Sequence, residues 1–408
     1  MPWVSAKDMK QLFIDDAEDH ISEEGLQAGS KLAERGDVLL LTRGMTLLKD
    51  VPIGVVRRPV AFNQDVKAIR SSSDRLAPEF LPYLLLGNKQ ALQDSVDQAG
   101  HGTGRISTDL LLALPVRLPP VELQLKLAAN LRAMDDRIAL NHAMNQTLED
   151  IARAVFKSWF IDFDPVHAKA EGKATGLPPE IDALFPSEFE ETEEGVVPGG
   201  WPSVPLREQV EVTRGLSYSG AGLGEPGEGV PMHNLNSIYE GGGYKTAGLK
   251  WFTGDFKERH IAKPGDVLVA NTEQGFDRLL IGSPALVPDA WDGPTIFSHH
   301  LYKVDPKPDA RVTRDYMAYW LKDRTLHDWV SGFANGTTVN MLPKDALEMP
   351  DIVLPPHGLI AALGHMVRAF HAKMELNEKQ AASLGELRDL LLPKLISGEL
   401  QVPHEVVA

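Results

Sequence analysis

The sequence predicts a mixed α+β protein in which two globular domains are joined by two long helices. The helices are expected to form an antiparallel coiled coil, and the whole is expected to have a pseudo-twofold internal repeat. Two observations lead to this fold class. The same short motifs occur twice in the same order, and each copy is followed by a long stretch with heptad spacing of apolar side chains. A chain of 408 residues is also too long for one ordinary core.

The duplication is visible in pairs of motifs whose order is preserved. Their separation starts at 229 residues and settles at 236, as insertions in surface loops would produce. A period this long indicates a duplicated domain rather than a solenoid. The pairs are Gly36-Asp37-Val38-Leu39 with Gly265-Asp266-Val267-Leu268, Phe62 with Phe297, Tyr83 with Tyr319, Gly102-Thr103 with Gly336-Thr337, and Leu118-Pro119-Pro120 with Leu354-Pro355-Pro356.

The first long helix is expected from about Val121 to Phe160, directly after a Pro-Pro pair, because proline suits the first turn of a helix. The steps of its apolar register alternate between four and three residues, which is the heptad seam of a coiled coil. This seam comprises Leu127, Leu131, Met134, Ile138, Asn141, Asn145, Leu148, Ala152, Val155 and Trp159.

The second long helix follows the second Pro-Pro pair, and Pro393 is expected to kink or end it. Neither helix can bury its apolar face alone, so we expect each long helix to pair with its duplicate. Asn141 and Asn377, at matching seam positions, would then fix the register. The alternative is two unrelated core helices in separate domains. The second seam comprises Leu363, Val367, Phe370, Met374, Asn377, Ala381, Leu384, Arg388, Leu391 and Leu395.

Each globular domain is expected to mix short strands with helices. The segments "GDVLLLTRG" and "GDVLVANTE" predict a turn followed by a buried strand. The segments "APEFLPYLLLGNKQAL" and "TRDYMAYWLKDRTLHDWV" predict amphipathic helices, and "VRLPP" and "DIVLPP" predict short strands that lead into the long helices.

Loops in both domains carry polar residues of the kind that read base edges, since Arg pairs with guanine and Asn or Gln with adenine in the major groove. The same loops are polar in both halves but differ in residue type, as two copies that read different sequences would show. The alternative for each single residue is ordinary polar surface. The candidates are Ser5, Lys7, Asp8, Thr42, Arg43, Thr46, Asn63, Gln64, His101, Thr103 and Arg105 in the first domain, and His233, Asn234, Asn236, Asn271, Glu273, Gln274, His299, His300, Asn335, Thr337, Thr338 and Asn340 in the second.

Composition limits the function classes. The chain has no cysteine, which excludes disulfides, thiolate zinc sites and cysteine nucleophiles, and fits the cytoplasm. It shows no apolar run long enough to span a membrane and no recognisable leader. The net charge of −16 predicts weak DNA binding by the chain alone, because phosphate affinity comes from cations. A partner protein is therefore expected to supply much of the affinity for DNA.

Several patterns imitate catalytic or ligand motifs without their context. "DFDP" follows the first long helix and is interpreted as its terminator, although it partly matches a methyltransferase motif. Gly222, Gly224 and Gly227 have GxGxxG spacing, but Pro226 and the missing strand–helix context argue against dinucleotide binding. Adjacent histidines such as His299-His300 rarely face one metal ion. We therefore expect no catalytic, cofactor or metal site in this chain.

The long helices and several loops resemble type I restriction–modification specificity subunits. "LPPVELQLKLAANLRAMDDRIALNHAMNQTLEDIARAVFKSWFIDFDPV" is similar to their central helical region, and "LPPHGLIAALGHMVRAFHAKMELNEKQAASLGELRDLLLPKLISGEL" to their distal one. "PWVSAKDM", "TRGMTLL", "AFNQD" and "GHGTGRIST" resemble one class of their target recognition domains. The resemblance covers nearly the whole chain, and the helical regions are its most specific part.

The resemblance implies a non-catalytic subunit whose two target recognition domains each read one half of a split site in double-stranded DNA. The helices would act as a ruler between the two halves. Two methyltransferase subunits and restriction–translocase subunits are the implied partners. Methylation of adenine would use S-adenosylmethionine bound by the methyltransferase subunits, and ATP and magnesium are implied for partner subunits.

We expect domain boundaries at 1–118 for the first recognition domain, 119–163 for the central helix, 164–200 for an acidic, Pro- and Gly-containing linker, 201–354 for the second recognition domain, 355–400 for the distal helix and 401–408 for a tail.

The second domain opens with "WPSVPLREQVEVTRGLSYSG", about 29 residues before Pro231. Pro2 aligns with Pro231, so the first domain is expected to lack the matching segment of about 29 residues. Either the true start lies upstream, or the first domain is a truncated copy. A missing opening strand would leave an unpaired sheet edge, so the first domain is expected to be less stable or to borrow cover from a partner.

Three other interpretations remain open. One is the specificity protein of a related DNA-modification defence system or of a stand-alone modification complex. Another, of a different class, is an autonomous DNA methyltransferase or nuclease. The third is a purely structural coiled-coil scaffold, which would show no sequence preference.

Overall fold

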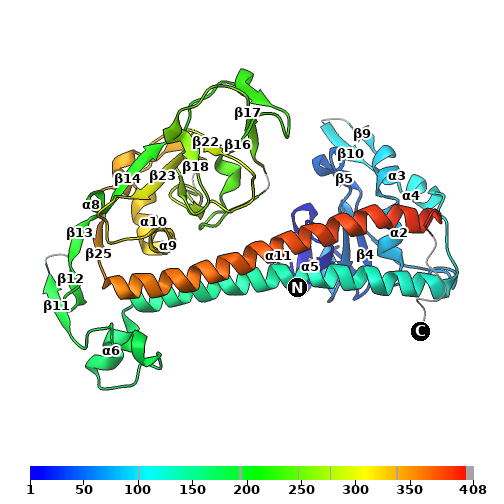
Figure 1. Cartoon of the computed structure of the whole chain (residues 1–408). Coiled ribbons are helices and arrows are strands. Elements are labelled where there is room, and N and C mark those ends of the chain that lie inside the picture. Colours follow the sequence, from blue (N-terminus) through cyan, green and yellow to red (C-terminus); the bar gives the residue numbers. More distant parts are fainter. Residues whose placement is uncertain (100–101, 193–194, 247, 276, 337–338, 401–408) are drawn as a thin grey trace. The chain divides into compact units, whose positions relative to one another are not determined.

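Two long helices, α5 (Val121–Phe160, 40 residues) and α11 (His357–Ser397, 41 residues), run through the computed structural model (Figure 1). The structure describes residues 1–408 except 100–101, 193–194, 247, 276, 337–338 and 401–408. Both helices begin directly after a Pro-Pro pair, as predicted. Pro393 was expected to kink or end the second helix; it does not end it, because α11 continues past it to Ser397.

The chain folds into two units, and each unit is built from both halves of the sequence. The first unit comprises residues 1–143 and 377–408, and the second comprises residues 144–376. Each unit therefore contains one globular domain together with a segment of α5 and a segment of α11.

The two helices pair antiparallel in each unit. In the first unit the Asn141 Nδ2 donates to the Asn377 carbonyl (3.3 Å) and to Gln380 Oε1 (3.1 Å), and Arg137 reaches the same Gln380 oxygen. In the second unit the Asn145 Nδ2 donates to the Met374 carbonyl (3.2 Å). Lower numbers on one helix meet higher numbers on the other, as an antiparallel pair requires, and every predicted seam residue is buried or half-buried. The predicted coiled coil is confirmed.

The globular part of the first unit contains three small sheets, with strand orders β2-β6-β4-β8, β1-β7-β3 and β5-β10-β9. The strand β4 is buried along its whole length, as its apolar run predicts. The strands are β1 (Trp3–Val4), β2 (Phe13–Ile14), β3 (Lys31–Ala33), β4 (Val38–Leu41), β5 (Arg43–Gly44), β6 (Ile53–Val56), β7 (Val60–Phe62), β8 (Val66–Ile69), β9 (Asp97–Ala99) and β10 (Thr103–Arg105). The helices are η1 (Ala6–Asp8), α1 (Glu23–Gln27), η2 (Met45–Leu48), α2 (Leu81–Gly87), α3 (Lys89–Asp94) and α4 (Thr108–Ala113).

The second unit contains sheets of order β14-β23-β19-β21 and β15-β17-β16-β22-β18, with the strand pairs β11-β12, β13-β25 and β20-β24. Its strands are β11 (Phe189–Thr192), β12 (Gly195–Pro198), β13 (Ser203–Pro205), β14 (Val210–Arg214), β15 (Leu223–Gly224), β16 (Val230–His233), β17 (Lys250–Phe252), β18 (Ile261–Ala262), β19 (Val267–Ala270), β20 (Thr272–Gln274), β21 (Pro284–Leu286), β22 (Thr295–Phe297), β23 (Leu301–Pro306), β24 (Val339–Met341) and β25 (Asp351–Val353). Its helices are α6 (Asp164–Ala170), α7 (Pro179–Asp182), α8 (Leu206–Gln209), η4 (Gly220–Gly222), η5 (Leu235–Ser237), η6 (Glu258–His260), α9 (Arg314–Trp320), α10 (Arg324–Ser331) and η7 (Lys344–Leu347). None of the helices in the described part of the chain is long and apolar enough to cross a membrane.

The sequence repeat is a repeat of the fold. The strand β1 pairs in parallel with β7, and β16 pairs in parallel with β22. The strand β4 lies between β6 and β8, and β19 lies between β21 and β23, all antiparallel. Even a local cap recurs: Ser5 and Asp8 form a capping box on η1, and Asn234 and Ser237 form one on η5. The duplicated motifs therefore occupy equivalent places in two similar domains.

Each predicted amphipathic helix of the globular domains is divided in two. The first becomes α2 and α3, and the second becomes α9 and α10. The second division has a clear cause, because the Asp323 carboxylate accepts from the Leu326 N (3.1 Å) and so caps a new helix.

The two domains differ at both edges of the sheet that contains β4 or β19. In the first unit β2 covers the outer edge of β6, whereas β21, the equivalent of β6, is an edge strand among the described residues of the second unit. In the second unit β14 covers the outer edge of β23 over five residue pairs, Val210–Arg214. In the first unit the equivalent strand β8 pairs only with β4 among the described residues. The prediction of a strand at "VRLPP" was wrong, because residues 114–120 form no strand. Its counterpart β25 is held by β13, and no described segment of the first unit takes the place of β13.

We predict that the outward-facing amides of β8 exchange with solvent about ten-fold or more faster than those of Leu301–Val304 in β23, because they lack a strand partner. Hydrogen–deuterium exchange of the full chain, followed peptide by peptide, measures the difference. The inner amides, which pair with β4 and with β19, provide the control. Equal protection of the two outer edges would count against an unpaired edge in the first unit.

The segment 164–200, expected as a solvated linker, is largely folded within the second unit. Val166 of α6 and Phe185 are buried in the main core of that unit. The Phe163 ring lies edge-on to Trp201 at 5.8 Å, and Lys169 Nζ donates to the Asp182 and Phe185 carbonyls. The acidic run is carried partly by β11, where Glu190 and Glu191 are exposed, and partly by residues 193 and 194, which lie outside the described residues. Apolar residues between the charges therefore outweigh the charge pattern that suggested a linker.

Candidate nucleic-acid interface

The residues that follow the two buried central strands, β4 and β19, sit in the same hydrogen-bonded arrangement. In the first unit the Thr42 N donates to the Asp65 carbonyl (2.7 Å), and the Ile106 N donates to the Thr42 carbonyl (2.9 Å). In the second unit the Asn271 N donates to the His300 carbonyl (3.0 Å), and the Leu342 N donates to the Asn271 carbonyl (2.8 Å). We call these arrangements the first frame and the second frame. Each brings together three of the loops predicted to read DNA.

Two arginines lie side by side next to the first frame. Arg43 on β5 and Arg105 on β10 are directly opposite each other in an antiparallel pair, so their side chains leave the same face of the sheet. Both are exposed, and no carboxylate among the described residues lies within 4.0 Å of either guanidinium. Two adjacent guanidinium groups suit the paired acceptors of guanine or a phosphate.

The other first-domain candidates near this frame differ in their freedom to bind. Gln64 and Thr46 are exposed. The Asn63 Oδ1 accepts from the Asp65 N (3.1 Å), and Thr103 is half-buried on β10. Thr42 is buried and donates to the Asp65 carbonyl (3.0 Å). His101 lies outside the described residues.

Ser5, Lys7 and Asp8 have internal partners. The Ser5 N and Oγ donate to one Asp8 carboxylate oxygen (2.8 and 3.0 Å), and the Glu18 N donates to the other (2.9 Å). Lys7 pairs with Glu18 and Asp19 at 3.2 and 2.9 Å. These contacts hold the turn around η1, so we leave these three side chains out of the interface proposed below.

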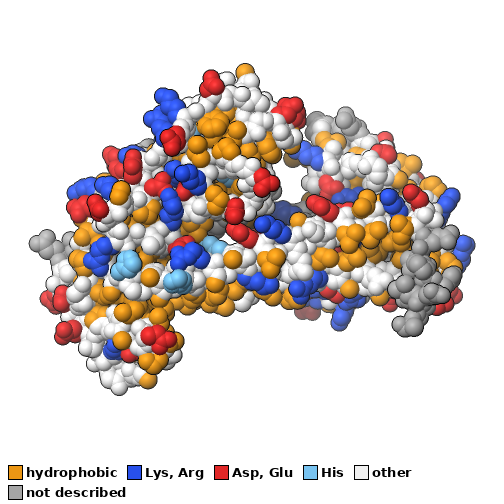
Figure 2. Space-filling view, in the orientation of Figure 1, with side chains coloured by type: hydrophobic (Ala, Val, Ile, Leu, Met, Phe, Trp, Pro, Cys, Tyr) orange, Lys and Arg blue, Asp and Glu red, His pale blue; other side chains and the backbone are white. Residues whose placement is uncertain are grey.

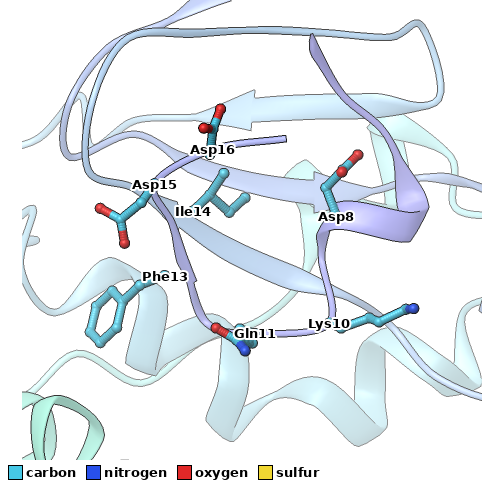
Figure 3. Close-up of a pocket in the computed structure, with 7 residues that line it drawn as sticks. All are labelled: Asp8, Lys10, Gln11, Phe13, Ile14, Asp15 and Asp16. Atoms are coloured by element: carbon cyan, nitrogen blue, oxygen red, sulfur yellow. The ribbon is translucent and has the colours of Figure 1, made fainter. Parts of the chain in front are cut away.

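The same turn borders a hollow of about 280 Å³ between η1 and β2 (Figure 3). Three carboxylates, Asp8, Asp15 and Asp16, are among the seven side chains that line it, with Lys10 as the single cation. Asp16 is paired with Arg58 at 2.8 Å. Asp15 lies 3.7 Å from Arg57, and Asp8 accepts from Ser5 and Glu18, so these carboxylates also have internal partners. We therefore do not include the hollow in the candidate interface.

A cluster of cationic and aromatic side chains adjoins the second frame. The His300 Nδ1 is 2.8 Å from the Thr272 Oγ1, and the rings of His299 and His300 are 3.9 Å apart. Tyr218 lies edge-on to His299 at 5.6 Å and accepts a hydrogen bond from Lys250 Nζ (2.7 Å). The Arg214 Nε donates to the His299 carbonyl (3.3 Å). We call Arg214, Tyr218, Lys250, His299 and His300 the second-frame cluster.

The surroundings of the two histidines in this cluster favour the neutral imidazole. Burial lowers the pKa of His299 and of His300 from 6.5, and the positive charges of Arg214 and Lys250 lower both further. A neutral imidazole can donate through one nitrogen and accept through the other. The buried His299 Nδ1 has no hydrogen-bond partner within the described structure. The cluster thus places two cations, Arg214 and Lys250, which suit phosphate, beside two imidazole rings.

Several predicted second-domain residues instead support the fold. His233 is fully buried between Tyr244 (2.7 Å) and Thr295 (2.8 Å), and burial lowers its pKa to about 3. Asn234 caps η5, and the Glu273 carboxylate accepts from the Leu279, Leu280 and Ile281 amides. The Asn271 Nδ2 donates to the His299 carbonyl, and the Asn340 Nδ2 to the Gly275 carbonyl.

The remaining second-domain candidates are Asn236, Gln274 and Asn335, which are exposed, and Thr337 and Thr338, which lie outside the described residues. In the part of the chain that the structure describes, no group of three or more His, Asp or Glu side chains is placed to hold a metal ion.

Sequence reasoning missed Arg214, Tyr218 and Lys250. The first two had a usable signal, because "TRGLSYSG" places an arginine and a tyrosine in a Gly- and Ser-rich segment. Lys250 has no local signal, since β17 brings it to Tyr218 from elsewhere in the chain.

Comparisons with known proteins agree with this architecture. Residues 1–150 match the family model for the type I restriction modification DNA specificity domain. The chain is 26% identical over 381 residues to the type I restriction enzyme HindI specificity subunit of Haemophilus influenzae, covering 81% of this chain and 79% of that protein. It is 25% identical over 415 residues to the MjaIX specificity subunit of Methanocaldococcus jannaschii, covering 98% of this chain and 87% of that protein.

Among solved structures, the fold is similar to the crystal structure of a type I restriction–modification system S subunit from M. genitalium. The TM-score is 0.52 at 12% identity, over 98% of this chain and 93% of that one. At this identity the likeness concerns the fold.

Proposed function

We infer that this chain, a member of the type I restriction–modification specificity subunits, is the DNA-recognition subunit of a larger enzyme and reads a DNA site in two parts. One observation carries the two-part reading. Equivalent frames in the two domains present different side chains, Arg43 and Arg105 beside the first frame and the second-frame cluster beside the other. Different donors and acceptors beside equivalent frames favour different bases.

The surface of the long helices supports two equivalent protein partners. Four large apolar side chains on the long helices, between 42% and 59% exposed, have an exposed apolar counterpart in the other unit: Leu140 and Leu387 in the first unit, Leu376 and Ile151 in the second. Val121, Leu125 and Leu390 of the first unit are also exposed, but the repeat gives them no large apolar counterpart. The repeat relates Leu140 to Leu376 and Ile151 to Leu387. Hydrophobic side chains gather along the helices in Figure 2. We propose that two methyltransferase subunits dock on these two patches and that restriction–translocase subunits join them.

The chemistry would then belong to the partners. S-adenosylmethionine would be bound by the methyltransferase subunits and used to methylate adenine, and ATP and magnesium would be used by the restriction–translocase subunits. The net charge of −16 fits this division, since partners would supply the cations that hold the DNA backbone.

The proposal predicts a bipartite pattern of methylated adenines when the full chain is co-expressed with its methyltransferase subunit and the modified sites are mapped. Replacing residues 201–350 by another recognition domain should change one half of the motif only. Adding one heptad to both α5 and α11 should widen the gap between the halves while keeping the bases. The chain expressed alone is the control and should leave DNA unmodified and uncut. Methylation or cleavage by the purified chain alone would instead show an autonomous enzyme.

A further inference from the structure

We propose that buried charges between the domains and the helix pair determine which halves of the chain associate. We call this set of charges the pairing code. In this code the first half of the chain (residues 1–173) accepts only the second half (residues 174–408) as its partner and rejects a second copy of itself. Both halves contribute to each unit, so the code can be examined twice, once in each unit. The inference does not depend on the proposed function.

In the second unit a carboxylate from the first half meets a buried ammonium from the second half. Glu149 on α5 accepts from Lys322 Nζ (2.7 Å), which lies just after α9. The same carboxylate accepts from the Tyr319 hydroxyl (3.0 Å), which also contacts His371 Nε2 (3.1 Å). The Lys322 side chain is 5% exposed and that of Glu149 is 14% exposed.

In the first unit, different residues form an equivalent acid–cation pair between the two halves. Asp135 on α5 accepts from the Tyr83 hydroxyl (2.9 Å) and from the Arg388 guanidinium on α11. The Asp135 side chain is 3% exposed and that of Arg388 is 19% exposed. Here too the first half supplies the acid and the second half supplies the cation.

The sequence repeat shows what a pairing of like halves would contain. It relates Tyr83 to Tyr319, Leu86 to Lys322, Asp135 to His371, Glu149 to Gly385 and Ala152 to Arg388. Two first halves would bring Asp135 of one copy to Glu149 of the other, with leucine and alanine at both cation positions. Two second halves would bring Lys322, His371 and Arg388 together, with glycine at the acid position. Glu149 would keep only Arg153 of its own helix (2.8 Å), and Arg388 only the exposed Asp389 (2.7 Å). Asp135 and Lys322 would lose their partners from the other half, and a buried charge without its partner is strongly unfavourable.

Apolar packing is a competing source of the same preference. A side-chain carbon added at Gly87 would lie only 2.2 Å from Ile396 on α11, so the two are in close contact. The repeat relates Ile396 to the larger Phe160, which would fit less well against Gly87. The test therefore has to separate charge from shape.

The test uses the full chain, cut after it has folded. A protease site is placed at residues 172–174, which are exposed between α6 and α7. Isotopically heavy and light samples of the cut protein are mixed and incubated until heavy–light pairs of first and second halves reach the statistical level. Native mass spectrometry then counts pairs of like halves. We expect fewer than about one in a hundred. A statistical share of like pairs would overturn the proposal.

A charge-neutral variant separates charge from shape. Asp135→Asn combined with Glu149→Gln should raise pairs of first halves to about a tenth of assemblies or more, because no buried carboxylates then face each other. The matched control, Asp136→Asn with Asp150→Asn, changes the exposed neighbours and should leave the share unchanged. Continued absence of such pairs in the charge-neutral variant would assign the preference to packing.

A variant designed to increase pairing between first halves keeps the proposal testable if the charge-neutral variant does not assemble. Leu86→Lys places a cation where Lys322 stands in the other domain, and so offers a partner to Glu149 of a second copy. Pairs of first halves should increase about ten-fold or more over the unaltered cut chain. No increase would count against the code.

Discussion

The Glu149→Gln variant is expected to lose about 3–5 kcal/mol of unfolding free energy in its second unit, because it leaves the Lys322 ammonium buried without its carboxylate. Urea unfolding followed by tryptophan fluorescence measures the loss, since six of the seven tryptophans belong to that unit. The matched control is Asp150→Asn, an exposed carboxylate on the next residue of α5, which should change stability by less than about 0.5 kcal/mol.

The double variant Glu149→Leu with Lys322→Met is expected to recover most of the lost stability, because an apolar pair buries no charge. Failure of the double variant to recover stability, together with a similar loss in the Asp150 control, would mean that general disruption of α5 and not the stranded charge explains the effect.

The same ion pair makes the stability of the second unit depend on pH. Burial by itself would raise the pKa of Glu149, but the Lys322 ammonium and Arg153 outweigh it and lower the pKa from 4.5 to about 2. Because the folded value is below the unfolded one, this contribution is present above pH 4.5 and is lost as the pH falls toward 2. The unaltered chain should lose stability through this window, and Glu149→Gln should lose less.

Replacing both Arg43 and Arg105 by alanine is expected to weaken DNA binding by the assembled complex about 10- to 100-fold and to relax the first half of its motif only. Each bidentate contact to guanine contributes about 1–3 kcal/mol of discrimination. Binding titrations at fixed salt and mapping of the methylated sites measure the two effects. The matched control is Arg35→Ala, an exposed arginine before β4, at the opposite end of that strand from Arg43.

Substitution of the same two residues by lysine separates base reading from phosphate binding. Lysine keeps the positive charge but cannot make the bidentate contact. Retained affinity with a relaxed first half-site would identify guanine reading, and retained affinity with an unchanged motif would identify phosphate contacts. If the double alanine variant left both affinity and motif unchanged, the first frame would not be part of the DNA interface.

The sequence by itself determined the two long helices, their antiparallel pairing and the duplication of the domains. These features depend on local periodicity and on short motifs, which the chain displays in order whatever its surroundings. The heptad steps through Asn141 and Asn377 predicted a register that the hydrogen bond between these residues then confirmed. The buried strands β4 and β19 were predicted for the same reason, since continuous apolar runs leave few alternatives.

Only the tertiary structure decided which polar residues are free to bind. Asn234 and Asn236 are two residues apart in one polar loop, yet the first is buried as a cap and the second is exposed. Local sequence is blind to this difference, because a loop asparagine has the same chemistry whether it satisfies a turn or faces solvent. The second-frame cluster and the paired charges of Glu149 with Lys322 and Asp135 with Arg388 join residues far apart in the chain. Such contacts depend on how distant elements pack, and no pattern along the sequence records that.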